Sequence, residues 1–222
     1  MNKYGSVLVV AIGSFLFSSV ASASLITTLF NTGVDAAGNP LVGGNGVTDT
    51  HYTVLSGPGV VAPASAVTYD NPAYLADQPS GTNGNSRWIS VNANGSSANS
   101  GTYVFETTFS LAGFDPTTAS ITGRFAVDNH ITVTSLNGNT IAGATANSFT
   151  TYSNFSIPTG SGFVAGLNKL DFTVVDDGAP MALRVDSLVG NASVSAVPEP
   201  ATMSLLGFGL IGLGFMARKL RA

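Results

Sequence analysis

The sequence contains no cysteine among its 222 residues and only two histidines, His51 and His130. Without cysteine the chain can form no disulfide, no thiolate nucleophile and no cysteine-ligated zinc site. Two separated histidines do not indicate a zinc site either, because such sites usually need three or four ligands. The fold must therefore be stabilised by packing, with or without a bound ion.

Basic residues are also scarce. Only eight Lys and Arg are present, and four of them, Lys3, Arg218, Lys219 and Arg221, lie at the two ends of the chain. The remainder keeps four cations against eleven acids, a net charge near −7. Such a surface argues against nucleic acid as a partner and against anionic polysaccharide bound by charge alone. It suits a neutral glycan, a cation, or solubility alone.

Helical periodicity is absent from residues 24–196, which are rich in Gly, Thr, Ser and Asn. Thr102–Leu111 alternates between apolar and polar residues, as a half-buried strand does. Asn137-Gly138 is typical of a type I′ hairpin turn. Further strands are expected at Leu25–Phe30, His51–Leu55, Ser120–Val127, Ile131–Leu136, Phe149–Phe155, Leu170–Val175 and Leu183–Val189. Short strands separated by frequent turn signals predict an all-β domain, an antiparallel jelly-roll-like β-sandwich.

The N-terminus has the pattern of a secretory signal peptide. Asn2 and Lys3 precede an apolar stretch, Val7–Phe17, and the small residues Ala21 and Ala23 suit the two pocket positions of signal peptidase. We expect residues 1–23 to be the signal peptide, with cleavage after Ala23. The alternative is an uncleaved anchor, which the short apolar stretch disfavours.

The C-terminus combines three features in order. Val197-Pro198-Glu199-Pro200 is followed by an apolar run, Met203–Ala217, and then by Arg218, Lys219 and Arg221. The prolines favour an extended segment that a protease can bind as a strand. As a helix the apolar run would span only about 22 Å, against a hydrocarbon core of about 30 Å. The terminal cations would keep the end of the chain on the cytoplasmic side.

These features resemble the PEP-CTERM sorting signal of exported bacterial proteins, in which Pro198, Glu199 and Pro200 match the motif residue for residue. The resemblance assigns residues 197–222 to sorting and implies a membrane-embedded exosortase-type enzyme as the partner. It also implies transient anchoring by a single C-terminal hydrophobic helix, then release or transfer to the cell surface. A permanent anchor with a chance Pro-Glu-Pro is the alternative, which the short apolar run disfavours.

The body of the chain resembles the galactose-binding-like jelly rolls found in PEP-CTERM ectodomains. The resemblance rests on five segments: residues 50–53, 86–89, 101–105, Asp128-Asn129 ahead of 136–138, and 162–168. It implies a fold in which such domains often bind carbohydrate and some carry a structural calcium ion. Neither property transfers to this chain without residues to bear it.

Two groups of residues in the body could carry a ligand. Trp88 and Tyr52 could form an aromatic platform for a sugar ring, although Trp88 is more typical of a core residue. Asp176-Asp177-Gly178 offers two carboxylates to Ca²⁺, but neighbours on a strand point to opposite faces, which favours a charged hairpin turn. The sequence therefore admits a calcium ion without indicating one. It shows neither a nucleophile elbow nor an obvious pair of glycosidase carboxylates.

We therefore expect an exported, non-enzymatic surface or matrix protein associated with extracellular polysaccharide. The alternatives are a carbohydrate-binding module or adhesin, with or without calcium, and a polysaccharide-degrading enzyme.

Overall fold

The computed structural model describes residues 23–76, 85–95, 99–195 and 201–220. The chain divides into two compact units. One comprises Ser22–Ser195, close to the expected ectodomain of residues 24–196, and the other includes the C-terminal helix.

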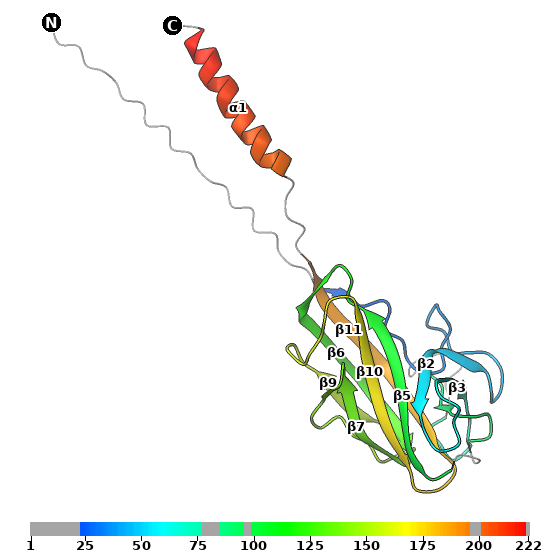
Figure 1. The fold of residues 1–222 in the computed structure, drawn as a ribbon. Helices are drawn as coiled ribbons and strands as arrows, with labels where there is room; N and C mark the ends of the chain where they lie inside the picture. The colour runs from blue at the N-terminus through cyan, green and yellow to red at the C-terminus, as the bar shows by residue number, and fades with distance from the viewer. Residues whose placement is uncertain (1–22, 77–84, 96–98, 196–200, 221–222) are drawn as a thin grey trace, which may run out of the picture. The chain divides into compact units, whose positions relative to one another are not determined.

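The described residues of the larger unit form eleven strands, the longer of which Figure 1 labels. They are β1 (Ala23–Leu25), β2 (Thr48–Ser56), β3 (Ala64–Thr68), β4 (Ile89–Ser90), β5 (Gly101–Ser110), β6 (Phe114–Asp128), β7 (His130–Leu136), β8 (Asn139–Thr140), β9 (Ser153–Ile157), β10 (Leu167–Asp176) and β11 (Ala182–Val194). Every paired neighbour runs antiparallel. The hydrogen-bonded order is β8-β7-β10-β5-β2-β3-β4-β11-β6-β9, with β1 added to β11.

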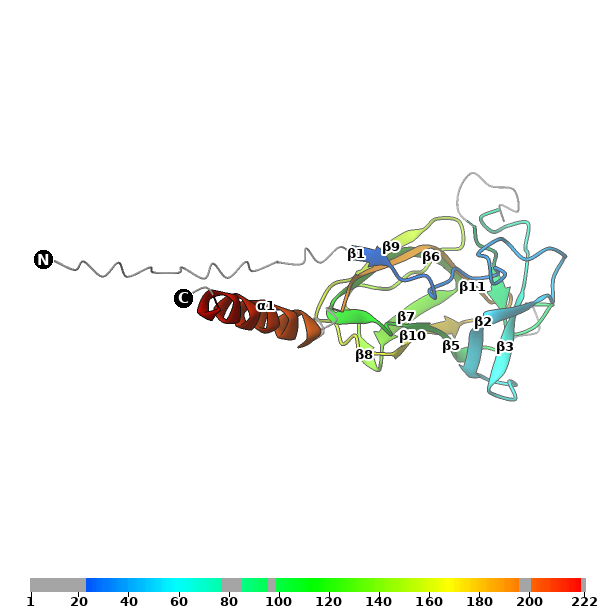
Figure 2. The ribbon, with the colours of Figure 1, turned by 90° about the horizontal axis from the view of Figure 1, so that it is seen from above.

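This continuous path folds over into two layers, which Figure 2 shows one above the other. One layer is β8-β7-β10-β5-β2, the other is β4-β11-β6-β9 with β1, and β3 lies between them in the order. From β5 to β7, and again from β9 to β11, each successive strand crosses to the opposite layer. The predicted antiparallel jelly-roll-like sandwich is confirmed.

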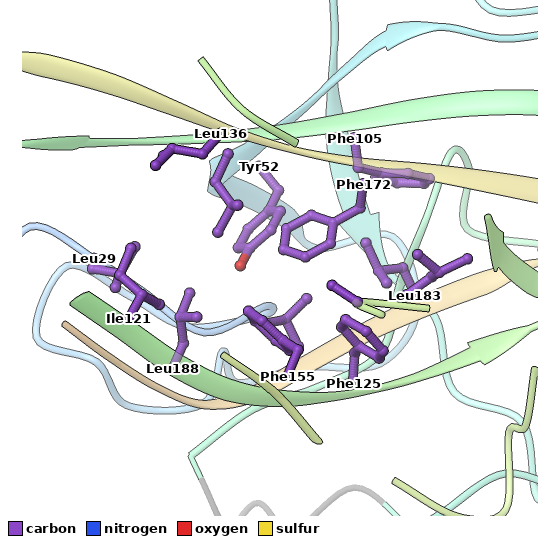
Figure 3. Close-up of a cluster of buried hydrophobic side chains, with 14 of the residues drawn as sticks. Leu29, Tyr52, Phe105, Ile121, Phe125, Leu136, Phe155, Phe172, Leu183 and Leu188 are labelled. Atoms are coloured by element: carbon purple, nitrogen blue, oxygen red, sulfur yellow. The ribbon is translucent and has the colours of Figure 1, made fainter. Parts of the chain in front are cut away.

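The main core lies between the layers, where side chains of both meet (Figure 3). Phe172 of β10 packs edge to face against two rings of the facing layer, with centroid distances of 6.4 Å to Phe125 and 6.3 Å to Phe155. Edge-to-face contacts of this kind are the favoured geometry for aromatic pairs. Tyr52 of β2 adds a fourth ring at 6.4 Å from Phe172.

The alternation of side chains along each strand determines which residues enter this core. In β5 the expected inward residues Tyr103, Phe105 and Phe109 are all buried, and Leu111 just beyond the strand is buried too. Asn137 and Gly138 have φ values of 51° and 81° and join the paired strands β7 and β8. Positive φ at both positions is the signature of the predicted type I′ turn.

Two strand expectations are wrong in part. The expected strand Leu25–Phe30 is reduced to β1, which ends at Leu25. The expected strand Phe149–Phe155 begins only at Ser153, because the hydroxyl of Ser148 accepts hydrogen bonds from the main-chain N–H groups of Thr150 and Thr151. Such side-chain to backbone bonds compete with strand pairing.

A second, smaller hydrophobic cluster lies apart from the main core. Its buried members are Tyr69, Tyr74, Trp88, Ala126 and Ala182. The indole Nε1–H of Trp88 donates to the carbonyl of Leu75 at 2.8 Å. The buried guanidinium of Arg184, on β11, donates to the carbonyl of Ala76 at 3.0 Å and to the hydroxyl of Ser86 at 2.9 Å. The chain around residues 69–76 and 86–88 therefore covers one side of the β6–β11 pair.

The second unit contains the single helix α1 (Ala201–Lys219), which confirms the expected C-terminal helix. Its described apolar side chains, among them Phe208, Leu213 and Phe215, are exposed. Arg218 and Lys219 lie in its last turn. Among the helices of the described residues, none reaches the combination of length and apolar character that crossing a membrane requires.

Candidate functional site

The residues predicted to form the sorting signal fall mostly outside the described part of the chain. Val197, Pro198, Glu199 and Pro200 lie there, as do Arg221 and Ala21. Of the three basic residues predicted to fix the membrane orientation, Arg218 and Lys219 are exposed at the C-terminal end of α1. Cations interact favourably with the helix dipole at this end. Ala23, the expected cleavage position, is the first residue of β1 and pairs with Ser193 of β11.

Trp88 and Tyr52 do not form an aromatic platform, and Trp88 is a core residue, which was the favoured interpretation of the sequence. Each side chain is only 1% exposed. Tyr52 lies in the main core and donates its hydroxyl to the carbonyl of Phe30 at 3.0 Å. Trp88 lies in the second cluster, with its ring centroid 4.6 Å from that of Tyr74. A sugar ring needs an open aromatic face, and neither residue offers one.

The disfavoured alternative at Asp176-Asp177, in which both carboxylates hold one ion, does not match the structure. Asp176 is 2% exposed and continues the inward row of β10, whereas the Asp177 side chain is 62% exposed. The two residues form the start of the β10–β11 turn, so the charged-turn interpretation is confirmed. Within the described ranges no three His, Cys, Asp or Glu residues come together as metal ligands.

The structure instead joins two corners of the sandwich that are distant in sequence. The main-chain N–H of Asp177 donates to Oδ1 of Asn129 at 2.8 Å, and Nε2 of His130 lies 2.7 Å from Oδ2 of Asp177. The β6–β7 corner and the β10–β11 corner are thereby held in contact. Asp128 and Asp176, the last residues of β6 and β10, lie at this junction.

Asp128 is a buried carboxylate with two hydrogen-bond donors. The hydroxyl of Tyr74 donates to Oδ2 and the amide of Asn129 to Oδ1, both at 2.7 Å. Burial raises the pKa of the Asp128 carboxyl; the Tyr74 hydrogen bond acts in the opposite direction, and the charge of Asp176 raises the pKa further. The pKa of Tyr74 is raised by burial and by its bond to Asp128.

An open depression of about 410 Å³ lies beside this junction. Its lining residues are His130, Ile131, Thr132, Thr145, Ala146, Asn147 and Ser153. Most of these side chains carry hydroxyl, amide or imidazole groups that can exchange hydrogen bonds with a polar ligand. No motif in the sequence indicates this depression, because its residues come from three separate segments.

A second charged arrangement was also missed. Arg124 donates to Oδ2 of Asp186 through Nε at 3.0 Å and through a terminal nitrogen at 2.6 Å. The same guanidinium lies 4.2 Å from the ring centroid of Tyr152. Register pairs Arg124 with Asp186 directly across β6 and β11, which sequence spacing alone could not reveal. Because these charges satisfy each other, the arrangement is structural.

Comparison with known proteins identifies the C-terminal segment. Residues 196–221 match the family described as the PEP-CTERM protein-sorting motif. The chain thus carries this sorting motif, as its resemblance indicated, and the motif implies an exported protein. No curated protein matches the chain at a significant level.

Two solved structures resemble the chain weakly. The CBM36-1 domain of a multidomain xylanase from the hindgut metagenome of Trinervitermes trinervoides is 12% identical, with a TM-score of 0.28, and the match covers 80% of this chain and 100% of that one. The enzymatically active domain of bacteriophage CBA120 tailspike protein 4 is 14% identical, with a TM-score of 0.30, over 82% of this chain and 21% of that one. Likenesses of this strength carry no argument about activity.

Proposed function

We propose that this chain is an exported, non-enzymatic protein of the cell surface or extracellular matrix, sorted through residues 197–222 and associated with extracellular polysaccharide. The observation that supports it most is the sorting motif at residues 196–221. In this account Pro198, Glu199 and Pro200 are read by a membrane-embedded exosortase-type enzyme. The sandwich, with Val194 ending its last strand only a few residues before the motif, is the part that is delivered.

The steps before processing follow from the physical chemistry of the two ends. The signal peptide, residues 1–23, directs export and is cleaved after Ala23. The apolar run Met203–Ala217 then holds the intermediate in the membrane, and Arg218, Lys219 and Arg221 keep its end on the cytoplasmic side. Cleavage near the motif transfers the sandwich to the surface or releases it.

The sorting step is tested by two glutamate substitutions in the host. Glu199 and Glu106 are the only glutamates, so Glu199→Gln and Glu106→Gln make the same chemical change at two places. We expect Glu199→Gln to retain the protein in the membrane fraction and Glu106→Gln to behave as wild type. Equal distribution of both variants would overturn the sorting role of Glu199.

Association with polysaccharide and absence of catalysis are tested on the secreted material. We expect the mature protein to co-purify with the matrix of the wild-type host and to leave that fraction when polysaccharide synthesis is abolished. Incubation with a panel of polysaccharides should release no reducing ends. Protein that stays in the matrix fraction without polysaccharide would contradict the first expectation, and turnover would contradict the second.

A second candidate function is a carbohydrate-binding module or adhesin, supported by the polar depression beside His130. With Trp88 and Tyr52 buried, this depression replaces the aromatic platform as the candidate contact for a neutral glycan. A glycan array with wild type and Asn147→Ala tests it, with Asn154→Ala, exposed on β9 but outside the depression, as the control. Retention of a glycan that only Asn147→Ala loses would support the candidate, whereas no retention would remove it.

A further inference from the structure

The end of the sandwich at which β11 finishes carries exposed apolar residues from three parts of the chain. Ser195, just after β11, donates its main-chain N–H to the carbonyl of Gly113 in the β5–β6 turn at 2.9 Å. Leu111, in the same turn, donates to the carbonyl of Gly166, just before β10, at 2.7 Å. The three parts are therefore adjacent. Their exposed apolar side chains, called the apolar rim below, are Ala112, Val164, Ala165, Leu167 and Val194.

The loop that contributes most of the rim is held in place from below. The side-chain amide of the buried Asn168 donates to the carbonyl of Val164 at 2.8 Å and to that of Gly166 at 2.9 Å. Its oxygen accepts the main-chain N–H of Val164 at 2.9 Å. This fixed loop leaves Val164 45% and Leu167 63% exposed. Because the backbone is already ordered, binding to the rim costs little conformational entropy.

The rim contains no charged residue. The charged residues nearest to it in the sequence are Asp115 and Lys169, and Nζ of Lys169 lies 3.0 Å from Oε2 of Glu106. The opposite end of the sandwich, where β6 and β10 finish, carries Asp128 and Asp177 instead. Anionic lipid surfaces are bound through clusters of Lys and Arg, which the rim does not have. An uncharged aliphatic surface fits an apolar protein surface better.

The sorting motif follows this end of the sandwich closely. Ser195 is hydrogen-bonded to the β5–β6 turn, and Pro198 is the third residue after it. Three fully extended residues span only about 10 Å. A protein that encloses Pro198-Glu199-Pro200 in a catalytic cleft must therefore come within about 10 Å of Ser195. The protein surface around such a cleft then meets the apolar rim.

We propose that the apolar rim is a docking surface for the membrane-embedded processing enzyme, which binds it through an apolar patch beside the catalytic cleft. This inference rests on the proposed sorting function and adds a second contact to the motif. Because only a short stretch joins the rim to the motif, binding of one raises the effective concentration of the other. The rim thereby speeds processing without taking part in the cleavage.

The test compares how fast full-length chains are processed in the host. Val164→Asp places a charge in the rim. Val61→Asp makes the same change at a residue that is 92% exposed in the β2–β3 connection. That connection contacts the start of β5, where Tyr103 donates to the carbonyl of Pro58, whereas the rim lies at the end of β5. In a pulse-chase experiment we expect Val164→Asp to lose its C-terminal segment about tenfold more slowly than wild type, and Val61→Asp at the wild-type rate.

A spacer provides an independent test. About twenty Gly and Ser residues inserted between Ser195 and Ala196 separate the rim from an intact motif. We expect the spacer to slow processing and to abolish the further effect of Val164→Asp, because the two changes remove the same contact. Leu167→Asp serves as a second rim variant if Val164→Asp does not fold. The thermal midpoint of each purified full-length chain in detergent checks its folding.

A photoreactive group identifies what the rim meets. Benzoylphenylalanine incorporated in place of Leu167 should crosslink to an epitope-tagged copy of the processing enzyme. The same group in place of Val61 should not. Crosslinks to lipid alone would assign the rim to the bilayer surface and overturn the proposal.

The rates separate failure of the rim from failure of sorting. If Glu199→Gln keeps its C-terminal segment while folded Val164→Asp and Leu167→Asp lose theirs at the wild-type rate, sorting stands and the docking surface is overturned. Faster processing with the spacer would overturn it as well, because the sandwich would then obstruct the enzyme. A wild-type chain that keeps its C-terminal segment throughout the chase would overturn both proposals.

Discussion

Trp88 donates its indole N–H to the carbonyl of Leu75 at 2.8 Å and thereby joins two segments that cover the β6–β11 pair. The neighbouring residue, Ile89, lies in the main core. Both faces of this short stretch are therefore buried, one on each side of the layer. The covering segment removes from solvent a surface that the alternation Trp88–Ile89 alone would leave exposed.

Small residues make room for this cover, and enlarging one should destabilise the domain. Ala126 and Ala182 lie beneath Trp88 and Tyr74 in the second cluster. We expect Ala126→Leu to lower the free energy of unfolding by about 1–3 kcal/mol through overpacking. Denaturant unfolding followed by far-UV circular dichroism measures the change. Ala142→Leu, at an exposed position, should leave the free energy of unfolding nearly unchanged. Equal effects of the two substitutions would contradict the close packing of the covering segment on Ala126.

Gly33 should not tolerate a side chain. Its φ is 66°, and a Cβ built there would lie 2.5 Å from Cβ of Arg87, whose own guanidinium donates to the carbonyls of Leu41 and Gly43. Gly143 has a similar φ of 75°, but its Cβ would meet nothing within 4 Å. We expect Gly143→Ala to cost about 1–2 kcal/mol for the backbone alone. Gly33→Ala should cost clearly more in denaturant unfolding, and equal costs would contradict the close contact.

Asp49 should make stability depend on pH in the acidic range. It is buried and accepts main-chain N–H bonds from Gly33 at 2.6 Å and His51 at 2.8 Å. Burial outweighs these bonds and raises the pKa of its carboxyl. The folded state therefore binds the proton of the Asp49 carboxyl more tightly than the unfolded chain does. The contribution of this carboxyl to the free energy of unfolding is complete below pH 3.8 and is lost as the pH rises through the pKa of the folded state.

Asp49→Asn should therefore reduce the fall in unfolding free energy that accompanies a rise in pH above 3.8. Denaturant unfolding at a series of pH values measures it. Asp115 should have the opposite effect. Hydrogen bonds from Thr117 lower the pKa of the Asp115 carboxyl, so the contribution of this carboxyl to the free energy of unfolding is lost as the pH falls. An unchanged slope in Asp49→Asn would show that the carboxyl titrates normally.

The sequence predicted the strands whose two faces differ in polarity. Thr102–Leu111 and Leu170–Val175 alternate because one face meets the core and the other meets solvent. The structure places strands at Gly101–Ser110 and Leu167–Asp176, close to both predicted ranges. It failed where local hydrogen bonding competes with pairing, as at Ser148. It favoured burial of Trp88, but it could not show that Trp88 and Ile89 are both buried, because the segment that covers Trp88 is distant in the sequence. Alternation reports that two side chains point apart, but not what lies over each of them.

The candidate sites also differ in how far the sequence could predict them. The sorting motif is a contiguous stretch and could be read directly from Pro198-Glu199-Pro200 and the basic end. The hydrogen bond from the main-chain N–H of Asp177 to Oδ1 of Asn129 joins residues 48 positions apart, and no local pattern encodes that contact. Asp176 was identified from its neighbour Asp177, which the strand geometry turns to the other side.

The most direct test of the sorting account is the intact mass of the mature protein recovered from its host. The account predicts a chain that begins at Ser24 and ends near Pro198–Pro200, with the apolar run and the terminal cations removed. A Glu199→Gln sample measured alongside should keep its C-terminal segment. A wild-type mass that still includes Arg221 and Ala222 would contradict the account and make the C-terminal segment a permanent part of the protein.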